Sequence, residues 1–273
     1  MDWIKTLLTS NNYTNKTSII NTYTGQLDHR SVDASLNPYV KNINSHDLFG
    51  STNTSLFAKE LSSNITNYEY GHINKGATLD LSSYKNLKTV RVEYIEGTLK
   101  LPSTLTKFTC TVIEKSSTID LSPCVNLTEV EVGFVFGILK LPVTSTLTSF
   151  VGEWIEKDVT IDLSSCTNLT TVKLVNIYGA LNLPSTVTRF NCAAIEKNST
   201  IDLSPCVNLA KVKIGFVFGI LKLPPTSTLT SFVCGWIEKD VNIDLSHCTN
   251  LKEVKVSHIY GNLQLPPAFI LNS

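Results

Sequence analysis

One long segment of the chain occurs twice. Residues 118–159 read TIDLSPCVNLTEVEVGFVFGILKLPVTSTLTSFVGEWIEKDV, and residues 200–241 read TIDLSPCVNLAKVKIGFVFGILKLPPTSTLTSFVCGWIEKDV, 82 residues later. Copies this similar at a fixed offset indicate an internal duplication and a repeat architecture. In such an architecture each unit packs only against its neighbours in a stack. The repeat therefore constrains the fold more than any single residue does, and it favours a binding or scaffold role over catalysis.

Two shorter apolar patterns alternate from residue 65 onward. The first, (L/I)xx(apolar)x(apolar)xx(I/V), occurs ten times, with starts 18, 20 or 22 residues apart. Its first residues are Ile65, Leu87, Leu105, Leu127, Leu147, Leu169, Val187, Leu209, Leu229 and Leu251. The second is a run of three, (I/L)xL, before Ser or Pro, as in Ile119–Leu121 and Leu139–Leu141. Both alternate apolar with polar residues, which is typical of strands with one buried face.

These patterns predict a mainly β solenoid of about ten coils of 20–22 residues, with two short parallel strands in each coil. No segment between the patterns is long enough for a regular helix. The solenoid should occupy residues 61–273. Residues 1–60 do not repeat, and helical spacing of apolar residues near Trp3 predicts a small helical N-terminal cap over the first coil.

The middle residue of the short run changes sign from coil to coil. The series is Asp80, Lys100, Asp120, Lys140, Asp162, Asn182, Asp202, Lys222, Asp244 and Gln264. In a parallel, in-register stack these residues are neighbours, so alternating signs give weak attractions where one column of carboxylates would repel. The series supports adjacent stacking of successive coils, and it argues against paired catalytic carboxylates.

Composition narrows the choice of partner and compartment. Lys plus Arg and Asp plus Glu both number 23, and this neutrality argues against nucleic acid as the main partner. The first residues contain no signal-peptide core, and no run of 18 apolar residues predicts a membrane span. A cytoplasmic location is expected, or the cell surface if an export signal precedes this sequence.

The seven cysteines fall into two repeat positions. Cys124, Cys166, Cys206 and Cys248 share one position, and Cys110, Cys192 and Cys234 share another, which Gly152 also occupies. Each cysteine therefore fills a small apolar position that tolerates replacement. The number is odd and no CxxC occurs, so buried free thiols are predicted rather than a disulfide framework or metal site. No cofactor is expected.

The segments LTEVEVGFV and LTSFVGEWI resemble leucine-rich repeats, which carry LxxLxLxxN/CxL in units of 20 to 29 residues. LKLPSTLTKF, LNLPSTVTRF and DLSSCTNLTTVKL are similar to the BspA-like (treponemal-type) subgroup. The ninth position departs from the pattern, because Ile or Val replaces Asn. An Asn before the strand in alternate coils could take over the turn-bonding role, at Asn86, Asn126, Asn168, Asn208 and Asn250. The resemblance implies surface adhesins or intracellular adaptors that bind proteins.

Positions three, five and eight of the longer pattern are expected to reach solvent on the broad face of the array. Position eight contributes Tyr94, Phe134, Trp154, Phe216 and Trp236, and position five contributes Val151, Val233, Lys173 and Lys213. Exposed aromatic rings are favoured binding anchors, so these residues are predicted to form a partner-binding surface. The alternative is that the coil bends there and buries the rings at a corner.

The sequence therefore predicts a non-enzymatic scaffold with a protein partner. No GxSxG, P-loop, HExxH or GxGxxG motif is present, and the five histidines are far apart in sequence. Two alternatives remain: an exported adhesin or surface antigen, and a structural protein that self-associates end to end through its C-terminal coil. That coil has no polar cap after Pro267, although Phe269, Ile270 and Leu271 could fold back as a lid.

Overall fold

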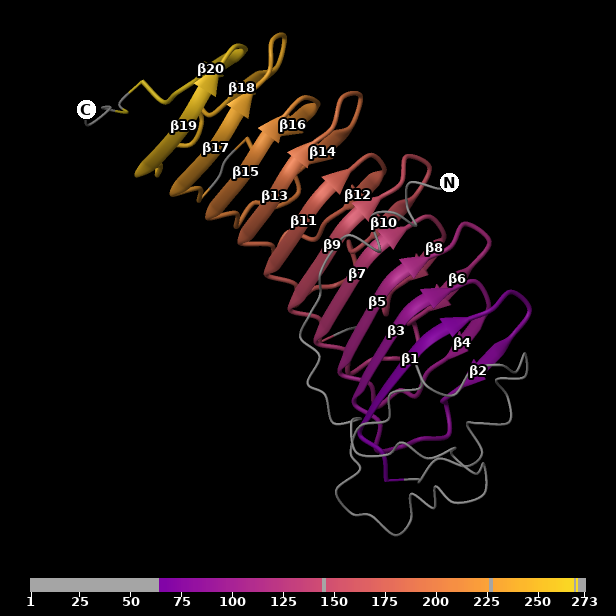
Figure 1. Ribbon diagram of the computed structural model, residues 1–273. Helices are drawn as coiled ribbons and strands as arrows, with labels where there is room; N and C mark the ends of the chain where they lie inside the picture. The colour runs from indigo at the N-terminus through magenta and orange to yellow at the C-terminus, as the bar shows by residue number, and fades with distance from the viewer. Residues whose placement is uncertain (1–63, 144–145, 226–227, 268, 270–273) are drawn as a thin grey trace, which may run out of the picture. The chain divides into compact units, whose positions relative to one another are not determined.

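The computed structural model describes residues 64–143, 146–225, 228–267 and 269. The predicted cap at residues 1–60 lies outside the described residues, as do Ile270 and Leu271 of the predicted lid. Every regular element in the described part is a β-strand, and long and short strands alternate (Figure 1).

Ten long strands of seven residues carry the longer sequence pattern. They are β1 (Asn67–Ile73), β3 (Thr89–Ile95), β5 (Lys107–Ile113), β7 (Glu129–Val135), β9 (Ser149–Ile155), β11 (Thr171–Ile177), β13 (Arg189–Ile195), β15 (Lys211–Val217), β17 (Ser231–Ile237) and β19 (Glu253–Ile259). They form one parallel sheet in chain order, and each pairs in register with the next. We call the outer side of this sheet the broad face.

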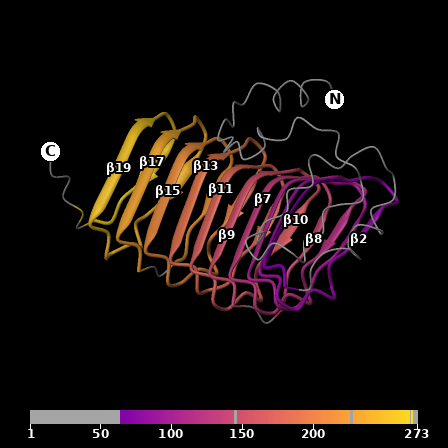
Figure 2. The ribbon, with the colours of Figure 1, turned by 60° about the horizontal axis from the view of Figure 1, so that its bottom comes forward.

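Ten short strands of three residues carry the second pattern. They are β2 (Thr78–Asp80), β4 (Thr98–Lys100), β6 (Thr118–Asp120), β8 (Ile138–Lys140), β10 (Thr160–Asp162), β12 (Ala180–Asn182), β14 (Thr200–Asp202), β16 (Ile220–Lys222), β18 (Asn242–Asp244) and β20 (Asn262–Gln264). They lie behind the long strands and pair as β2–β4, β6–β8, β10–β12, β14–β16 and β18–β20 (Figure 2). The predicted solenoid of about ten coils with two parallel strands each is confirmed, but the short strands form five separate pairs instead of one continuous sheet.

The sign changes along the short strands act within these pairs. Asp80 lies beside Lys100 with 3.6 Å between the charged groups, and Asp202 lies 3.7 Å from Lys222. Both pairs are exposed, so each contributes little to stability. The aspartates also close the following turn: Asp162 Oδ1 accepts hydrogen bonds from the Ser164 backbone N–H at 3.0 Å and from the Ser164 hydroxyl at 2.6 Å.

These turns predict a loss of stability in acid. The hydrogen bond from the Ser164 hydroxyl is the main cause that holds the pKa of Asp162 below its usual 3.8. Equivalent serines lower the pKa values of four other aspartates, Asp80, Asp120, Asp202 and Asp244. A carboxyl whose pKa is lower in the folded state stabilises the fold at pH values above the pKa of the unfolded chain. This stabilisation is lost as the pH falls through the pKa of the folded state. Carboxyl NMR titration should give Asp162 a pKa below 3.8 in the wild type. In Ser164→Ala this pKa should lie closer to 3.8. An unchanged Asp162 in that variant would contradict the turn mechanism.

The core is a stack of inward side chains that alternate in size. Position four of the long pattern reads Tyr68, Val90, Phe108, Val130, Phe150, Val172, Phe190, Val212, Phe232 and Val254. The four phenylalanines are fully buried. Position six of those four coils is small, a Cys or Gly152, whereas the coils with Val at position four carry Val, Leu or Ile there. Large and small residues thus interdigitate between coils, which keeps the packing dense.

Gly152 shows how closely this alternation is matched. A Cβ at Gly152 would lie 3.1 Å from Leu174 Cδ2 and 3.3 Å from Phe150 Cε1. Leu174 is the register partner of Gly152, while in the second copy Cys234 pairs with the smaller Val256. The extra volume of Leu174 therefore fills the space that Gly152 leaves.

We expect Gly152→Cys alone to crowd Leu174 and to lower the free energy of unfolding by about 1 kcal/mol. Leu174→Val alone should cost about 1 kcal/mol through the cavity it leaves. The double variant should unfold close to wild type in urea, because it reproduces the pairing of the second copy. Strictly additive losses would show that the two sites do not share volume.

The seven cysteines are free and buried, as predicted. Burial raises the pKa of Cys110 to about 12 and that of Cys206 to about 11. Thiols protonated at neutral pH are weak nucleophiles, so these residues act as small apolar fillers.

The predicted Asn column also has a structural role. The Asn126 side chain donates a hydrogen bond to the Ser103 carbonyl at 3.0 Å, and Asn208 donates to the Ser185 carbonyl at 3.3 Å. Each bond joins a turn to the neighbouring coil, so the expected turn-bonding role is confirmed at these two positions.

Candidate protein-interaction surface

The in-register pairing places the predicted aromatic residues in one column along the sheet. Phe134 pairs with Trp154, and Phe216 pairs with Trp236, which pairs in turn with His258. Tyr94 lies in the same column three strands from Trp154 and pairs with Val112. We call these position-eight residues the aromatic column. The structure thus brings Tyr94, Phe134, Trp154, Phe216 and Trp236 onto one edge of the broad face.

The exposure of the column lies between the two alternatives that the sequence left open. Tyr94, Phe134, Trp154 and Trp236 are half-buried, and Phe216 is 49% exposed. The small members of the column, such as Val112, are buried. The rings therefore neither stand free in solvent nor disappear into the core.

A second row of rings, which lies just outside the long sequence pattern, explains this half-burial. Position ten, just beyond each long strand, carries Phe136, Tyr178, Phe218 and Tyr260 in alternate coils. The Trp154 and Tyr178 ring centroids are 4.6 Å apart, and those of Trp236 and Tyr260 are also 4.6 Å apart. These rings directly precede Gly in the repeats FVFG and IYG, a regular spacing that could have identified them.

The intervening glutamates complete the surface. Trp154 Nε1 donates to Glu156 Oε2 at 3.5 Å, and Trp236 Nε1 donates to Glu238 Oε2 at 3.1 Å. In the sequence these glutamates belong to the repeated IEK segments, whose Glu and Lys follow the long strands. The lysines of these segments are exposed, but their glutamates are half-buried against the aromatic column.

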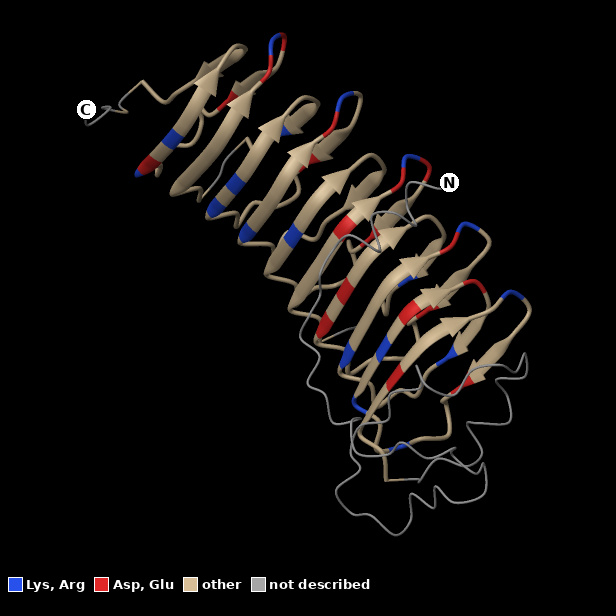
Figure 3. Ribbon diagram, viewed as in Figure 1, with Lys and Arg blue, Asp and Glu red and all other residues tan. Residues whose placement is uncertain are grey.

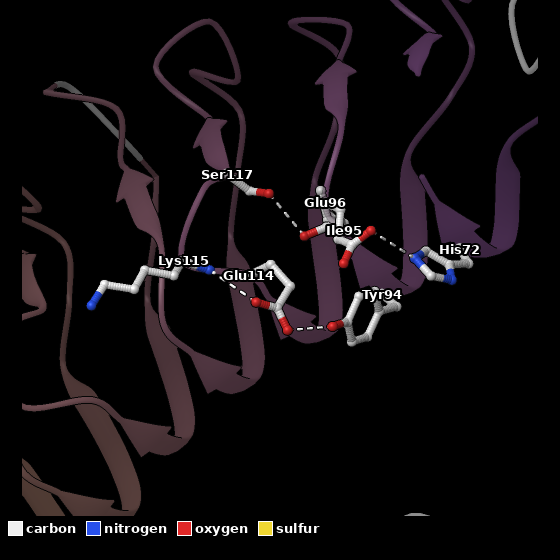
Figure 4. A network of polar contacts seen from close by, with 7 residues as sticks. All are labelled: His72, Tyr94, Ile95, Glu96, Glu114, Lys115 and Ser117. Atoms are coloured by element: carbon white, nitrogen blue, oxygen red, sulfur yellow. Dashed lines mark hydrogen bonds and ion pairs between the residues drawn. The ribbon is translucent and has the colours of Figure 1, made fainter. Parts of the chain in front are cut away.

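The N-terminal coils carry a polar version of the same contact. The Tyr94 hydroxyl donates to Glu114, whose other oxygen accepts the Lys115 backbone N–H at 3.2 Å (Figure 4). His72 Nε2 lies 3.8 Å from Glu96 Oε2, with its ring against that of Tyr94. Burial, followed by the hydrogen bond to Glu114, raises the pKa of Tyr94, so this phenol remains a neutral donor.

The position-five residues lie beside the aromatic column on the broad face. Val151 is half-buried and pairs with exposed Lys173, and half-buried Val233 pairs with exposed Lys213. Position seven, which was not among the predicted solvent positions, also reaches solvent, as Glu153 shows. Strict alternation fails here because two successive residues face outward between inward positions six and nine.

The duplication produces two equivalent aromatic clusters. We define the first cluster as Phe134, Phe136, Trp154 and Tyr178, and the second cluster as Phe216, Phe218, Trp236 and Tyr260. The interplanar angles agree, 35° for Trp154 with Tyr178 and 33° for Trp236 with Tyr260. Four strand spacings separate corresponding residues, roughly 19 Å at about 4.8 Å per parallel strand. The broad face therefore presents the Trp–Tyr–Glu contact twice, while the first cluster adds a Phe134–Trp154 contact at 6.3 Å and Trp236 of the second cluster contacts His258 at 5.1 Å.

The described residues give no direct sign of a metal centre or membrane span. Among them, no group of three or more His, Cys, Asp or Glu side chains is placed to hold a metal ion. The part of the chain that the structure describes also contains no helix long and apolar enough to cross a membrane.

Comparisons with protein-family models, with curated proteins and with solved structures give no match for this chain. Its class is therefore defined by the fold: it is a repeat protein built as a parallel β-solenoid of about ten coils.

The half-burial of the rings has a measurable consequence for stability. We expect Trp154→Ser to lower the free energy of unfolding by about 2 kcal/mol, because the half-buried ring already keeps part of its surface in solvent. Phe150→Ala should cost about 3–5 kcal/mol, because its ring is fully buried. Urea unfolding followed by circular dichroism measures both. Equal losses would show that Trp154 is a core residue and that the column is unsuited to binding.

Proposed function

We propose that this protein is a non-enzymatic scaffold that binds a protein partner on the broad face, with the two aromatic clusters as anchors. The observation that carries the proposal is the pair of half-exposed Trp side chains, each held by a ring and a carboxylate from neighbouring positions. Trp and Tyr dominate binding hot spots because they present a large contact area at a small entropic cost. Rings held in place before binding lose little further freedom on binding.

The absence of catalytic motifs in the sequence supports a binding role. The proposed partner-binding residues are Tyr94, Phe134, Trp154, Phe216, Trp236, Val151, Val233, Lys173 and Lys213. No cofactor is required by this function.

We further infer that the coils are leucine-rich repeats of the BspA-like type. The LxxLxL residues of each copy supply the inward side chains of the long strands, for example Leu127, Val130 and Val132, all buried. The replacement of the usual Asn at the ninth position is accommodated because that residue, such as Val135, is fully buried. A cytoplasmic adaptor and an exported adhesin are both compatible with this class, and we favour the cytoplasmic adaptor because all seven cysteines are free.

A second candidate function is end-to-end self-association through the C-terminal coil. Among the described strands, β19 has only β17 as a neighbour in the sheet, and its inward residues Val254 and Val256 are half-buried where equivalents in inner coils are buried. Phe269 packs against this end of the core. Sedimentation velocity over a wide concentration range tests the candidate, and a strict monomer at every concentration would exclude it.

The scaffold function is tested by capture from lysate of the source cells. Trp154→Ser/Trp236→Ser should lose a partner that the wild type retains, by about tenfold or more in affinity, since anchor residues carry most of the binding energy. The matched control is Ile138→Ser/Ile220→Ser, a duplicated pair 56% exposed on the short strands, away from the broad face.

The control variant should bind like the wild type, and circular dichroism should show that all three proteins fold. Equal capture by the Trp variant and the wild type would move the binding site away from the aromatic clusters. Equal loss in both variants would indicate a general effect on the fold.

A further inference from the structure

Charge divides the broad face into two halves of opposite sign. Among the described strands, β1 to β9 carry five glutamates and two cations on this face, whereas β11 to β19 carry five cations and one glutamate (Figure 3). The zero net charge of the chain conceals this division. The cations are densest on the adjacent strands β11, β13 and β15, where Lys173, Arg189, Lys211 and Lys213 are all exposed. We call these four residues the basic patch.

The duplicated copies show that the fold does not require this patch. Residues 118–142 and 200–224 differ at only four positions. Two of the four are outward positions where the sign reverses, from Glu129 to Lys211 and from Glu131 to Lys213. The backbone frame that carries the two lysines therefore also accommodates two glutamates.

The reversal removes a favourable contact and adds an unfavourable one. In the first copy Lys107 Nζ lies 2.9 Å from Glu129 Oε2. In the second copy the same two positions hold Arg189 and Lys211, register partners on adjacent strands. Like charges placed side by side on a sheet are destabilising. Stability alone thus favours Glu at position 211, so the basic patch needs another explanation.

Within the described residues, none of the four cations has a carboxylate at ion-pairing distance. The nearest acidic strand on the C-terminal side is β19, two strands from Lys211, and its Glu253 is bonded to Lys255 at 2.6 Å and to the Ser231 hydroxyl at 2.7 Å. The Lys255 hydrogen bond is the main cause that lowers the pKa of Glu253, and Lys211 adds a weaker attraction from a distance. The patch therefore offers unpaired positive charge to an external anion.

We propose that the basic patch binds an acidic segment of the partner protein, and that the second aromatic cluster receives an apolar side chain of the same segment. Phe216, which is 49% exposed, and Trp236 lie at the ends of β15 and β17, next to the lysines. This inference rests on the proposed scaffold function and specifies the chemistry of the partner.

The dimensions of the patch favour a polypeptide over a nucleic acid. Its four cations cover three strands, about 10 Å of the stack. Beyond β11 the same face carries Glu153, Glu131 and Glu129, so a duplex that follows the array would meet carboxylates. A short acidic peptide fits within the positive half, and its apolar side chain gains the neighbouring rings.

The test exchanges the charged residues of the two copies, so that each substitution introduces the residue that the other copy carries at the same position. The probe is a short labelled peptide in which glutamates alternate with serines around one phenylalanine. Its binding is measured by fluorescence anisotropy at low salt, because surface charges are screened over about 10 Å at 0.1 M salt. K211E/K213E should weaken binding by about tenfold or more. Transfer of the lysines to the first copy, in E129K/E131K/K211E/K213E, should restore binding beside the equivalent Phe134 and Trp154. A peptide with glutamine for glutamate should not bind.

Equal peptide binding by wild type and K211E/K213E would overturn the proposal, as would no binding to the wild type or equal binding of the glutamine peptide. Tighter binding of a short DNA duplex with the same dependence on Lys211 and Lys213 would assign the patch to nucleic acid instead. Sedimentation that shows wild-type self-association abolished by K211E/K213E would assign it to a second copy of the chain. A lysate partner lost in Trp154→Ser/Trp236→Ser but retained by K211E/K213E would sustain the scaffold function while refuting this inference.

Discussion

Volume complementarity between neighbouring coils is the constraint on which the rest of the structure depends. The parallel hydrogen-bond ladder fixes equivalent residues of successive coils side by side, so a column of phenylalanines at position four would be crowded, although leucines repeat without alternation at position one. Alternation of aromatic residues and valine at position four, offset by small and branched residues at position six, resolves the conflict. Because the backbone is held at one spacing throughout, the outward columns inherit the same regularity, and the Trp–Tyr pairs of the two aromatic clusters match in geometry.

The solenoid could be predicted from the sequence because the repeat and the alternation of apolar and polar residues can both be read without knowing any contact between distant residues. The repeat sets the unit, and the two-residue alternation assigns the inward face, as the buried Val130 and Val132 illustrate. The pairing of the short strands could not be predicted in the same way. Side-chain periodicity reports which residues face the core, but it does not report which backbone groups of neighbouring coils come within hydrogen-bond distance.

The binding surface was only partly predictable for a related reason. Position eight could be selected because Trp154 and Trp236 recur at an outward position, and this assignment as a binding site remains a prediction. Their half-burial depends on Tyr178 and Tyr260, which belong to the next coil and lie beyond the strand pattern. The alternation also fails between positions six and nine, where the chain begins its corner. Contacts made across coils at a corner are set by the stack, not by the local sequence.

Because the size of the core side chains alternates from coil to coil, two consecutive coils form the smallest repeating unit of the packing. Loss of one internal Val coil, such as that of Val172, would place the Phe coil of Phe150 directly against another Phe coil, and a small position-six residue against a second small one. Inside the array, only changes by an even number of coils preserve the match. The 82-residue duplication spans four coils and obeys this rule. Internal insertions or deletions in natural or engineered variants of this array should therefore comprise pairs of coils.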